Sequence, residues 1–309
     1  MNNTYGIKAY NDTVYSYARF ATFMHNGCYD LINSCINGAS GPRRGYLPHI
    51  GITGIATANP SIDTLCSEAA DMCRDNVESP YYYYGDRGVY DIRHPYNDPT
   101  PPSYYAEWLN QAKIQNAIGV STNYSSSNND IYWAFQATGD FIYPNFLFDL
   151  EEILSYGVRV NLFYGDADYI CNWFGGQAVS LAIKYAHSKE FAASGYAPFM
   201  YGGVEYGETR EYGNFSFTRI YEAGHEVPYY QPQAALALFK RTIQLMDIPT
   251  GEKKITGSYG TDGEASATHT EPFPGTVTAT GSAFAAYSSS IIASYASLDN
   301  EPPASVTAT

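Results

Sequence analysis

The sequence has 309 residues and a formal net charge of −14, with 17 basic against 31 acidic side chains. An acidic chain without a basic cluster is a poor match for nucleic acid or for anionic membrane surfaces, and no stretch approaches the ~18 apolar residues of a membrane span. We therefore expect neither nucleic acid nor a membrane among its partners.

The first half of the chain is expected to be mostly helical. Apolar residues recur there at three- and four-residue spacings in three segments, and the chain between these segments lacks a helical period. The second segment has a start signal at Asn59-Pro60-Ser61, where Asn or Ser can cap a helix and Pro lies in the first turn. The predicted helices cover residues 12–37, about 59–73 and 104–118, with a loop over 38–48 and an irregular stretch over 81–102.

Four cysteines in this half have a helical spacing. Cys28 and Cys35 are seven residues apart, as are Cys66 and Cys73, so each pair lies along one face of its helix. Antiparallel helices would give the bridges Cys28–Cys73 and Cys35–Cys66, and parallel helices would give the crossed pairing. Two bridges imply an oxidising compartment, whereas the alternative is four buried thiols in a cytosolic protein. Cys171 is left without a partner.

The second half alternates strands and helices. Two largely apolar runs, rich in β-branched and aromatic residues and bounded by glycine, are typical of buried parallel strands. Each is followed by a segment with helical spacing, which predicts a parallel α/β sheet. The strands are expected over residues 158–164 and 215–221, and the helices over residues 147–156, 173–187 and 232–246.

Two polar residues follow these strands in an order that suggests catalysis. Asp168 comes after the first strand and His225 after the second, and functional groups gather past the carboxyl ends of parallel strands. α/β-Hydrolases place the acid and the histidine of their triad in this order along the chain. From the residues alone, two other roles stay open: an aspartate after a strand often caps the next helix, and a histidine after glycine is often a turn residue.

The composition changes near Gly251, after which Ser, Thr, Ala and Gly dominate. We expect residues 251–309 to be disordered and residues 1–250 to hold the fold, with 1–135 mostly helical and 136–250 the parallel-sheet part. The chain opens without the charged and apolar regions of a signal peptide, so we expect its start to be missing. Four glycosylation sequons agree with a secretory route, at Asn2, Asn11, Asn123 and Asn214.

Two ungapped stretches resemble signatures of the serine carboxypeptidases. Residues 165–173, Gly-Asp-Ala-Asp-Tyr-Ile-Cys-Asn-Trp, look like the segment around that family's catalytic aspartate. Residues 223–232, Ala-Gly-His-Glu-Val-Pro-Tyr-Tyr-Gln-Pro, look like its catalytic-histidine segment. Shorter family stretches match at Thr138-Gly139-Asp140-Phe141 and Asn3-Thr4-Tyr5-Gly6. The resemblance covers about residues 1–250 and implies the C-terminal portion of an α/β-hydrolase fold in a fungal-type member, with a disulfide-linked helical insertion and a disordered tail.

The resemblance assigns catalytic roles to two residues. Asp168 is the triad acid rather than Asp166, because it lies three residues before Cys171 as in the family motif, and His225 is the general base. The family's serine sits in a Gly-x-Ser-x-Gly turn, and the sequence contains no such motif. The family's oxyanion-hole glycines and the residues that hold the substrate's terminal carboxylate also lie upstream of everything matched here.

Four further residues receive substrate-binding roles from the resemblance. Ile170 and Cys171 are expected to border the subsite for the residue before the scissile bond, and Phe141 stands where the family usually has Trp in that wall. Glu226 is expected to line the pocket for the departing C-terminal residue. The alternatives are core packing for Phe141 and Ile170, an inert buried thiol for Cys171 and a solvent-facing side chain for Glu226.

The implied activity is release of C-terminal amino acids from peptides and protein C-termini by a serine-type hydrolase, without a metal or an organic cofactor. Because the nucleophile and the oxyanion hole are missing, we expect a truncated, inactive part of a secreted or vacuolar glycoprotein. The alternative is a non-catalytic pseudo-peptidase that acts as a peptide-binding or inhibitory protein.

Overall fold

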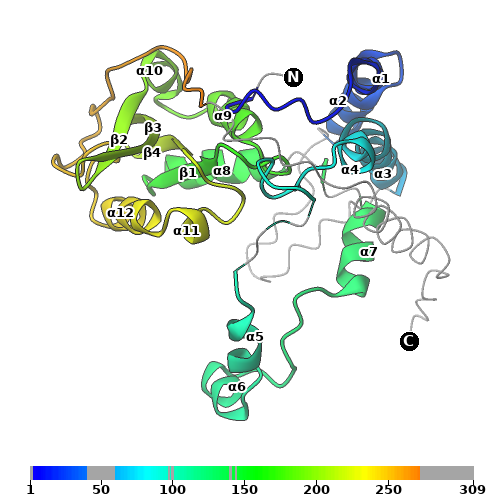
Figure 1. The fold of residues 1–309 in the computed structure, drawn as a ribbon, viewed down its shortest axis with the longest axis horizontal. Helices are drawn as coiled ribbons and strands as arrows, with labels where there is room; N and C mark the ends of the chain where they lie inside the picture. Colours follow the sequence, from blue (N-terminus) through cyan, green and yellow to red (C-terminus); the bar gives the residue numbers. More distant parts are fainter. Residues whose placement is uncertain are drawn as a thin grey trace.

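The structure is a computed structural model, and it describes residues 3–39, 60–96, 98, 101–138, 141–142 and 145–271. Figure 1 shows a sheet surrounded by helices, a separate cluster of helices from the first third of the chain, and helices α5 and α6 lying apart from both. The helices are α1 Asp12–Phe23, α2 Cys28–Ala39, α3 Pro60–Cys73, the π-helix η1 Arg74–Glu78, α4 Ser79–Tyr84, α5 Tyr104–Leu109, α6 Ala112–Ile118, α7 Asn129–Thr138, α8 Asn145–Ser155, α9 Trp173–Ala182, α10 Ser188–Ala193, α11 Val227–Tyr230 and α12 Pro232–Ile243.

The sheet has four strands among the described residues, in the order β1-β4-β3-β2. The two strands predicted from the sequence are β1 and β4, and they pair in parallel, so this prediction is confirmed. The sequence analysis missed β2 and β3, which form an antiparallel hairpin beside β4 and make the sheet mixed. The strands are β1 Val160–Gly165, β2 Ala197–Tyr201, β3 Val204–Tyr212 and β4 Phe215–Ile220.

Buried ion pairs explain why β3 does not read as a buried strand. Glu208 and Glu211 of β3 are buried although both are charged. Arg219 Nη1 donates to Glu208 over 2.9 Å, and Arg159 Nη2 donates to Glu211 over 2.6 Å. Burial raises the pKa of Glu211 to about 7, against the opposing effects of an amide hydrogen bond and of Arg159. Paired charges can lie inside a protein, but they remove the apolar pattern by which a buried strand is recognised.

Apolar side chains pack on both faces of the sheet. Phe215 and Phe217 of β4 belong to one cluster, with residues of α8, α9 and α10. Ile220 belongs to another, with Phe199 of β2 and residues of α11 and α12. Helices therefore cover both faces, as expected for a sheet that contains a parallel strand pair.

Two disulfides join α2 and α3. Cys28 bonds to Cys73 and Cys35 to Cys66, which is the pairing predicted for antiparallel helices. Cys35 and Cys66 are fully buried at the centre of this helix pair. Cys171 forms no disulfide, as predicted, and it is exposed.

The single helix predicted over residues 12–37 is wrong, because α1 and α2 are separated by a turn. Asn26 lies in the left-handed region at φ 56°, and a Cβ on Gly27 would lie 2.4 Å from a carbonyl oxygen of α1. The apolar period continues through this turn and hides it. The helix predicted over residues 104–118 is likewise two helices, α5 and α6, and Gly119 ends α6 at φ 75° as expected.

Residues 251–271 do not follow the prediction of disorder. Residues 251–271, which we call the strap, run beside β2 and β3, so the predicted boundary lies too early in the chain; residues 272–309 lie outside the described residues. Backbone hydrogen bonds hold the strap to the sheet region: Gly195 N to Thr261 O (3.0 Å), Tyr196 N to Glu264 O (2.7 Å) and Gly213 N to Tyr259 O (2.8 Å).

The far end of the strap meets the beginning of the described chain. The backbone N–H of Glu271 donates to the carbonyl oxygen of Thr4 over 2.8 Å. Arg219 Nη2 donates both to Thr4 Oγ1 (2.9 Å) and to the carbonyl oxygen of His269 (2.7 Å). A strap with few apolar side chains thus takes its shape from polar contacts with the rest of the fold, which composition alone does not reveal.

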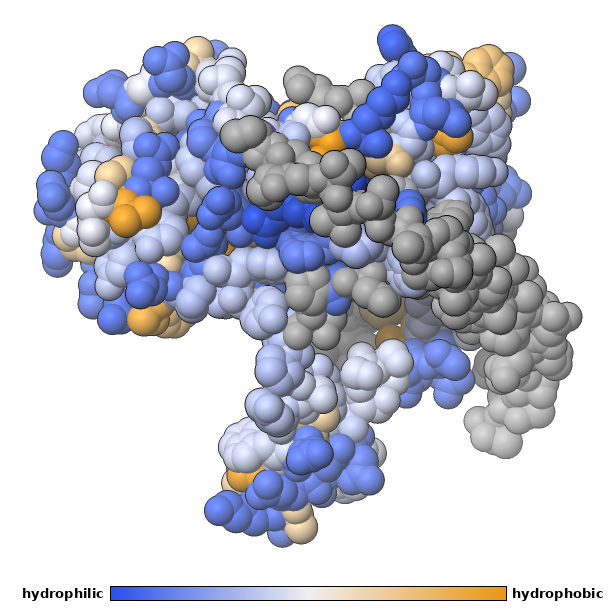
Figure 2. Space-filling model, viewed as in Figure 1, coloured by the Kyte–Doolittle hydropathy of each residue, from blue (hydrophilic) through white to orange (hydrophobic). Residues whose placement is uncertain are grey.

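The described helices are all too short or too polar to cross a membrane. Figure 2 shows hydrophilic side chains over most of the face in view, with hydrophobic ones singly or in small groups.

Replacement of Thr261 by Val should destabilise the protein by about 1–3 kcal/mol, because the change leaves buried polar groups unpaired. Thr261 Oγ1 donates to the carbonyl oxygen of Gly195 (2.6 Å) and accepts from the N–H of Glu211 (3.0 Å). Urea denaturation measures the free energy of unfolding. The matched control is Thr256→Val in the exposed part of the strap, where a change within about 0.5 kcal/mol is expected. Equal effects of the two substitutions would contradict a structural role for the strap.

Candidate active site at the ends of β1 and β4

Glycines let the turns after β1 and β4 meet backbone to backbone. A Cβ on Gly165 would lie 2.3 Å from the carbonyl oxygens of both Ala223 and Gly224. A Cβ on Gly224 would lie 2.3 Å from the carbonyl oxygen of Tyr90. Both distances are far below any real contact, so only glycine fits either position. The N–H of Ala167 then donates to the carbonyl oxygen of Ala223 over 2.9 Å and ties the two turns together.

This contact brings Asp168 to His225. Asp168 Oδ2 and His225 Nδ1 are 2.9 Å apart, and Asp168 Oδ1 accepts a hydrogen bond from the N–H of Cys171 (3.3 Å). Burial raises the pKa of Asp168, and the hydrogen bond from His225 acts in the opposite direction. Since a carboxylate only accepts, Nδ1 donates and Nε2 of the neutral ring is left to accept a proton. The acid is buried, whereas 37% of the His225 side chain is exposed.

Asp166 lies two residues before Asp168, but its carboxylate binds a different side chain. Its Oδ1 accepts a hydrogen bond from the hydroxyl of Tyr5 over 2.7 Å. Burial raises the pKa of Asp166 to about 6, although the Tyr5 hydrogen bond lowers it. Of the two carboxylates, Asp168 is therefore the one that the structure places against His225.

Cys171 completes a group of three side chains. Its Sγ lies with a carboxylate oxygen of Asp168 and a ring nitrogen of His225 within 4.8 Å of one another. Among the described residues, this is the single group of His, Cys, Asp and Glu side chains close enough to share a metal ion. Burial, followed by the Asp168 and Glu78 charges, raises the pKa of the Cys171 thiol. The expectation of a site without a metal stays a prediction.

The other three predicted substrate-binding residues, Ile170, Glu226 and Phe141, differ in how far they are buried. Ile170 is half-buried and packs against an apolar cluster that contains Tyr81 and Val89. Glu226 directly follows His225, and its Oε2 is buried without a hydrogen-bond partner among the described residues. Phe141 is 59% exposed.

The described contacts of Phe141 leave it apart from the other predicted residues. Its ring centroid lies 4.8 Å from the guanidinium carbon of Arg74 in η1. Within the part of the chain that the structure describes, no contact joins it to Asp168 or His225.

A loop that the sequence analysis read only as irregular supports both turns. The N–H of His225 donates to the carbonyl oxygen of Tyr90 over 2.8 Å, and the two rings lie 5.0 Å apart between centroids. On the other side, the N–H of Ile92 donates to the carbonyl oxygen of Ala167 over 2.9 Å. This loop, residues 88–96 together with Asp98, therefore contacts both the histidine turn and the aspartate turn.

Asp98 shapes this loop. Its carboxylate accepts hydrogen bonds from the N–H groups of Val89 (2.9 Å), Tyr90 (3.2 Å) and Asp91 (2.9 Å). The sequence analysis missed this role of Asp98. The signal that could have indicated it is an Asp in an aromatic, proline-rich stretch, because Asp often organises a turn by accepting hydrogen bonds from nearby N–H groups.

Three of the four sequons lie within the described residues, and Asn2 lies outside them. Asn11 and Asn123 are exposed. Asn214 is half-buried, and its Nδ2, the atom that a glycan would occupy, donates to the carbonyl oxygen of Val158 over 2.9 Å. Glycosylation at these positions stays a prediction.

Known proteins resemble this chain over most of its length. The family model described as serine carboxypeptidase matches residues 10–245. Carboxypeptidase S1 homolog A of Arthroderma otae is 39% identical over 273 residues, covering 87% of this chain and 40% of that protein. Homolog B of the same organism is 42% identical over 253 residues, covering 81% of this chain and 37% of that protein. The chain thus spans about two-fifths of the length of these curated relatives.

A solved structure is also similar to this chain, with a lower sequence identity than these relatives. It is that of Kex1Δp, a prohormone-processing carboxypeptidase from Saccharomyces cerevisiae. The TM-score is 0.40 and the sequence identity 15%, over 75% of this chain and 51% of that one.

Cys171 should react slowly with iodoacetamide near neutral pH, because only the thiolate reacts and the environment raises the pKa of this thiol. Asp168→Asn removes the nearby negative charge and should speed alkylation by roughly three- to tenfold at fixed pH. Alkylation rates followed by mass spectrometry across a pH series measure the effect at one site, since the other four cysteines form disulfides. Asp262→Asn, at an exposed aspartate, is the control for charge loss. Equal rates in the two variants would mean that Asp168 does not influence the thiol.

Proposed function

The chain belongs to the serine carboxypeptidase family, and from this premise we propose that it supplies the acid and the base of an enzyme that releases C-terminal amino acids from peptides. The observation that carries the proposal is the 2.9 Å contact between Asp168 Oδ2 and His225 Nδ1. It lies just past the ends of two adjacent parallel strands, where α/β enzymes gather their functional groups.

The proposed mechanism gives each residue one task. His225 Nε2 takes the proton of a serine hydroxyl as that oxygen attacks the scissile carbonyl, and returns it to the departing amino acid. Asp168 fixes the tautomer of His225 and stabilises the imidazolium that forms. Water, activated by the same histidine, then hydrolyses the acyl-enzyme. This chemistry asks for no metal and no organic cofactor.

The serine itself is proposed to come from outside these 309 residues. The sequence contains no Gly-x-Ser-x-Gly, and it spans about two-fifths of the length of its curated relatives. We therefore expect the 309 residues alone to be inactive, because an acid and a base without a nucleophile retain at most residual catalysis.

The substrate is proposed to lie beside the same turns. Ile170 and Cys171 follow Asp168 directly, and their position supports a role in the wall for the residue before the scissile bond. Glu226 follows His225, and its partnerless buried oxygen supports a role in the pocket for the departing residue. For Phe141, the contact with Arg74 supports packing rather than substrate binding.

A secreted or vacuolar location is part of the proposal. Two disulfides support an oxidising compartment. The exposed sequons at Asn11 and Asn123 are compatible with glycosylation on that route.

The 309-residue chain should neither hydrolyse a blocked dipeptide nor be labelled by a fluorophosphonate. In an enzyme that carries a serine elbow upstream of these residues, hydrolysis should be present, and His225→Ala should lower kcat by about 10⁴-fold or more. The exposed His25→Ala is the matched control and should leave kcat unchanged.

Each result of this experiment has a defined meaning. Stoichiometric labelling of one serine in the 309-residue chain would show that a nucleophile is present. Full activity of His225→Ala would refute its role as base. Peptide binding without turnover in the longer enzyme would favour the non-catalytic alternative.

Glu226→Gln should shift the choice of the departing residue. A carboxylate beside that residue favours a cationic side chain, so the ratio of kcat/KM for C-terminal Arg over Leu should fall by about fivefold. Steady-state kinetics of the longer enzyme at neutral pH measure this ratio. Glu107→Gln on α5 has the same charge change at an exposed position and should not alter it. An unchanged ratio in Glu226→Gln would mean that this carboxylate does not contact the substrate.

A further inference from the structure

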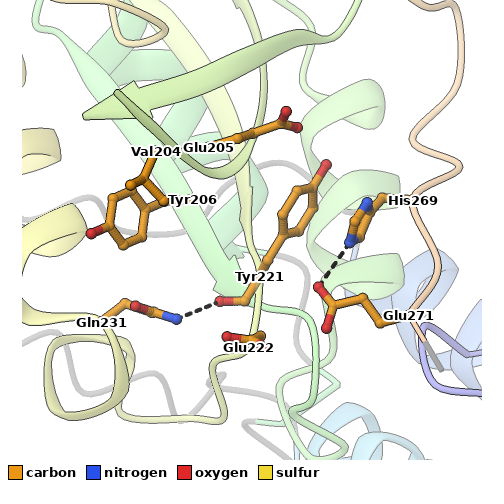
Figure 3. Close-up of a pocket in the computed structure, with 8 residues that line it drawn as sticks. All are labelled: Val204, Glu205, Tyr206, Tyr221, Glu222, Gln231, His269 and Glu271. Atoms are coloured by element: carbon orange, nitrogen blue, oxygen red, sulfur yellow. Dashed lines mark hydrogen bonds and ion pairs between the residues drawn. The ribbon is translucent and has the colours of Figure 1, made fainter. Parts of the chain in front are cut away.

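A cavity lies beside the end of β4, and its lining includes neither Asp168 nor His225. It is a cavity of about 300 Å³, at the small end of the range for ligand sites. Figure 3 shows its walls, which come from the start of β3, the turn after β4, the residue before α12 and the strap. The lining residues are Val204, Glu205, Tyr206, Tyr221, Glu222, Gln231, His269 and Glu271.

The cavity is acidic. Glu205, Glu222 and Glu271 line it, and none of its eight lining residues is Lys or Arg. Glu271 Oε1 pairs with His269 Nε2 over 2.8 Å. The nearby guanidinium of Arg219 is buried and already pairs with Glu208, outside the lining. A positively charged ligand would therefore meet an unneutralised excess of carboxylate.

An aromatic ring adds a second feature that suits a cation. Tyr206 lines the cavity and offers its ring to a ligand. The ring of Tyr221 is already engaged, since it stacks on His269 with 3.8 Å between centroids and the guanidinium carbon of Arg219 lies 5.6 Å from its centroid. A cation over an aromatic face is attracted by the ring quadrupole.

The hydroxyl of Tyr221 is an independent feature of the cavity. Tyr221 is 7% exposed, and a tyrosine buried to this degree usually has a hydrogen-bond partner for its hydroxyl. Among the described residues no partner is present. Figure 3 shows the hydroxyl directed into the space between Glu205 and His269. Its lone pairs are thus available to an N–H donor in the cavity.

The spacing of the acidic groups favours an organic cation over a metal ion. Asp168, Cys171 and His225 form the one described group whose ligand atoms converge within 4.8 Å, so the carboxylates and His269 of this cavity do not converge in that way. Acceptors spread around a cavity match a cation with several N–H donors. We propose that the cavity binds a guanidinium or alkylammonium group, either of a small free cation or of an Arg or Lys side chain in a peptide.

Two probes test the proposal on the full 309-residue chain by isothermal titration calorimetry. Agmatine carries a guanidinium without a carboxylate, and N-acetyl-Ala-Arg-Ala amide carries the same group on a peptide. We expect saturable binding with one site, and tighter binding of the peptide would identify a peptide side chain as the source. Binding should weaken as NaCl is raised, since exposed charges are screened. N-butylurea, a neutral analogue, should not bind.

Variants locate the site. Glu205→Gln and Glu271→Gln should each weaken binding by about fivefold, and Tyr221→Phe by about threefold. Glu107→Gln is the control for charge loss and should have no effect. Glu205 is exposed, so its substitution tests the site without disturbing the core.

Four results would overturn the proposal. They are no saturable binding of either cation, equal binding of N-butylurea, equal weakening in Glu107→Gln and Glu205→Gln, and stoichiometric displacement of agmatine by Ca²⁺ or Mg²⁺. Loss of binding in Glu226→Gln alone would place the cation beside His225 and would also overturn it.

Discussion

The turns after β1 and β4 touch through their backbones, and the geometry of the candidate active site depends on this contact. A side chain at Gly165 or at Gly224 would collide with carbonyl oxygens at 2.3 Å. Relief of such a clash would require the turns to separate by roughly an ångström, since real contacts are rarely shorter than about 3 Å. The 2.9 Å contact between Asp168 and His225 would not survive that movement. Backbone clearance thus sets the position of both functional side chains.

Charge pairing fixes the neighbouring strand in its register. Glu208 of β3 and Arg219 of β4 are direct cross-strand partners, and their side chains form an ion pair at 2.9 Å. A slip of one residue would direct both side chains to opposite faces and leave two buried charges unpaired. Such pairs add little net stability because each ion loses its hydration. Their effect here is to exclude other registers next to the strand that carries the histidine turn.

The sequence reveals those parts of this fold that carry their own pattern. The spacing of the four helical cysteines limits the disulfides to one pairing for antiparallel helices and one for parallel helices, and the structure has the antiparallel pairing. Two apolar runs predict β1 and β4. Asp168 and His225 follow those two strands, and this position marks them as candidate catalytic residues. Their roles as acid and base come from the resemblance to a known family.

Other parts take their structure from distant partners, so local pattern cannot reveal them. β3 is polar because arginines from elsewhere in the chain neutralise its buried glutamates. The loop of residues 88–96 and Asp98 has no period, yet the carbonyl groups of Val89 and Tyr90 accept hydrogen bonds from the N–H groups of Ile170 and His225. A family motif can also fail to predict a contact. Phe141 lies in such a motif, but the motif did not predict that its ring contacts Arg74.

The contact between Glu271 and Thr4 has a consequence for how the protein is made. A chain leaves the ribosome from its N-terminus, so Thr4 emerges long before the residue to which it bonds. Arg219, which also needs both Thr4 and His269, is buried only after the strap has been synthesised. Contacts that span most of the sequence form late, since the intervening loop must lose its entropy first. Until the strap is in place, Arg219 has Glu208 as a partner but lacks the carbonyl group of His269. This end of the sheet region therefore stays open to solvent and to chaperones until the last described residues have been synthesised.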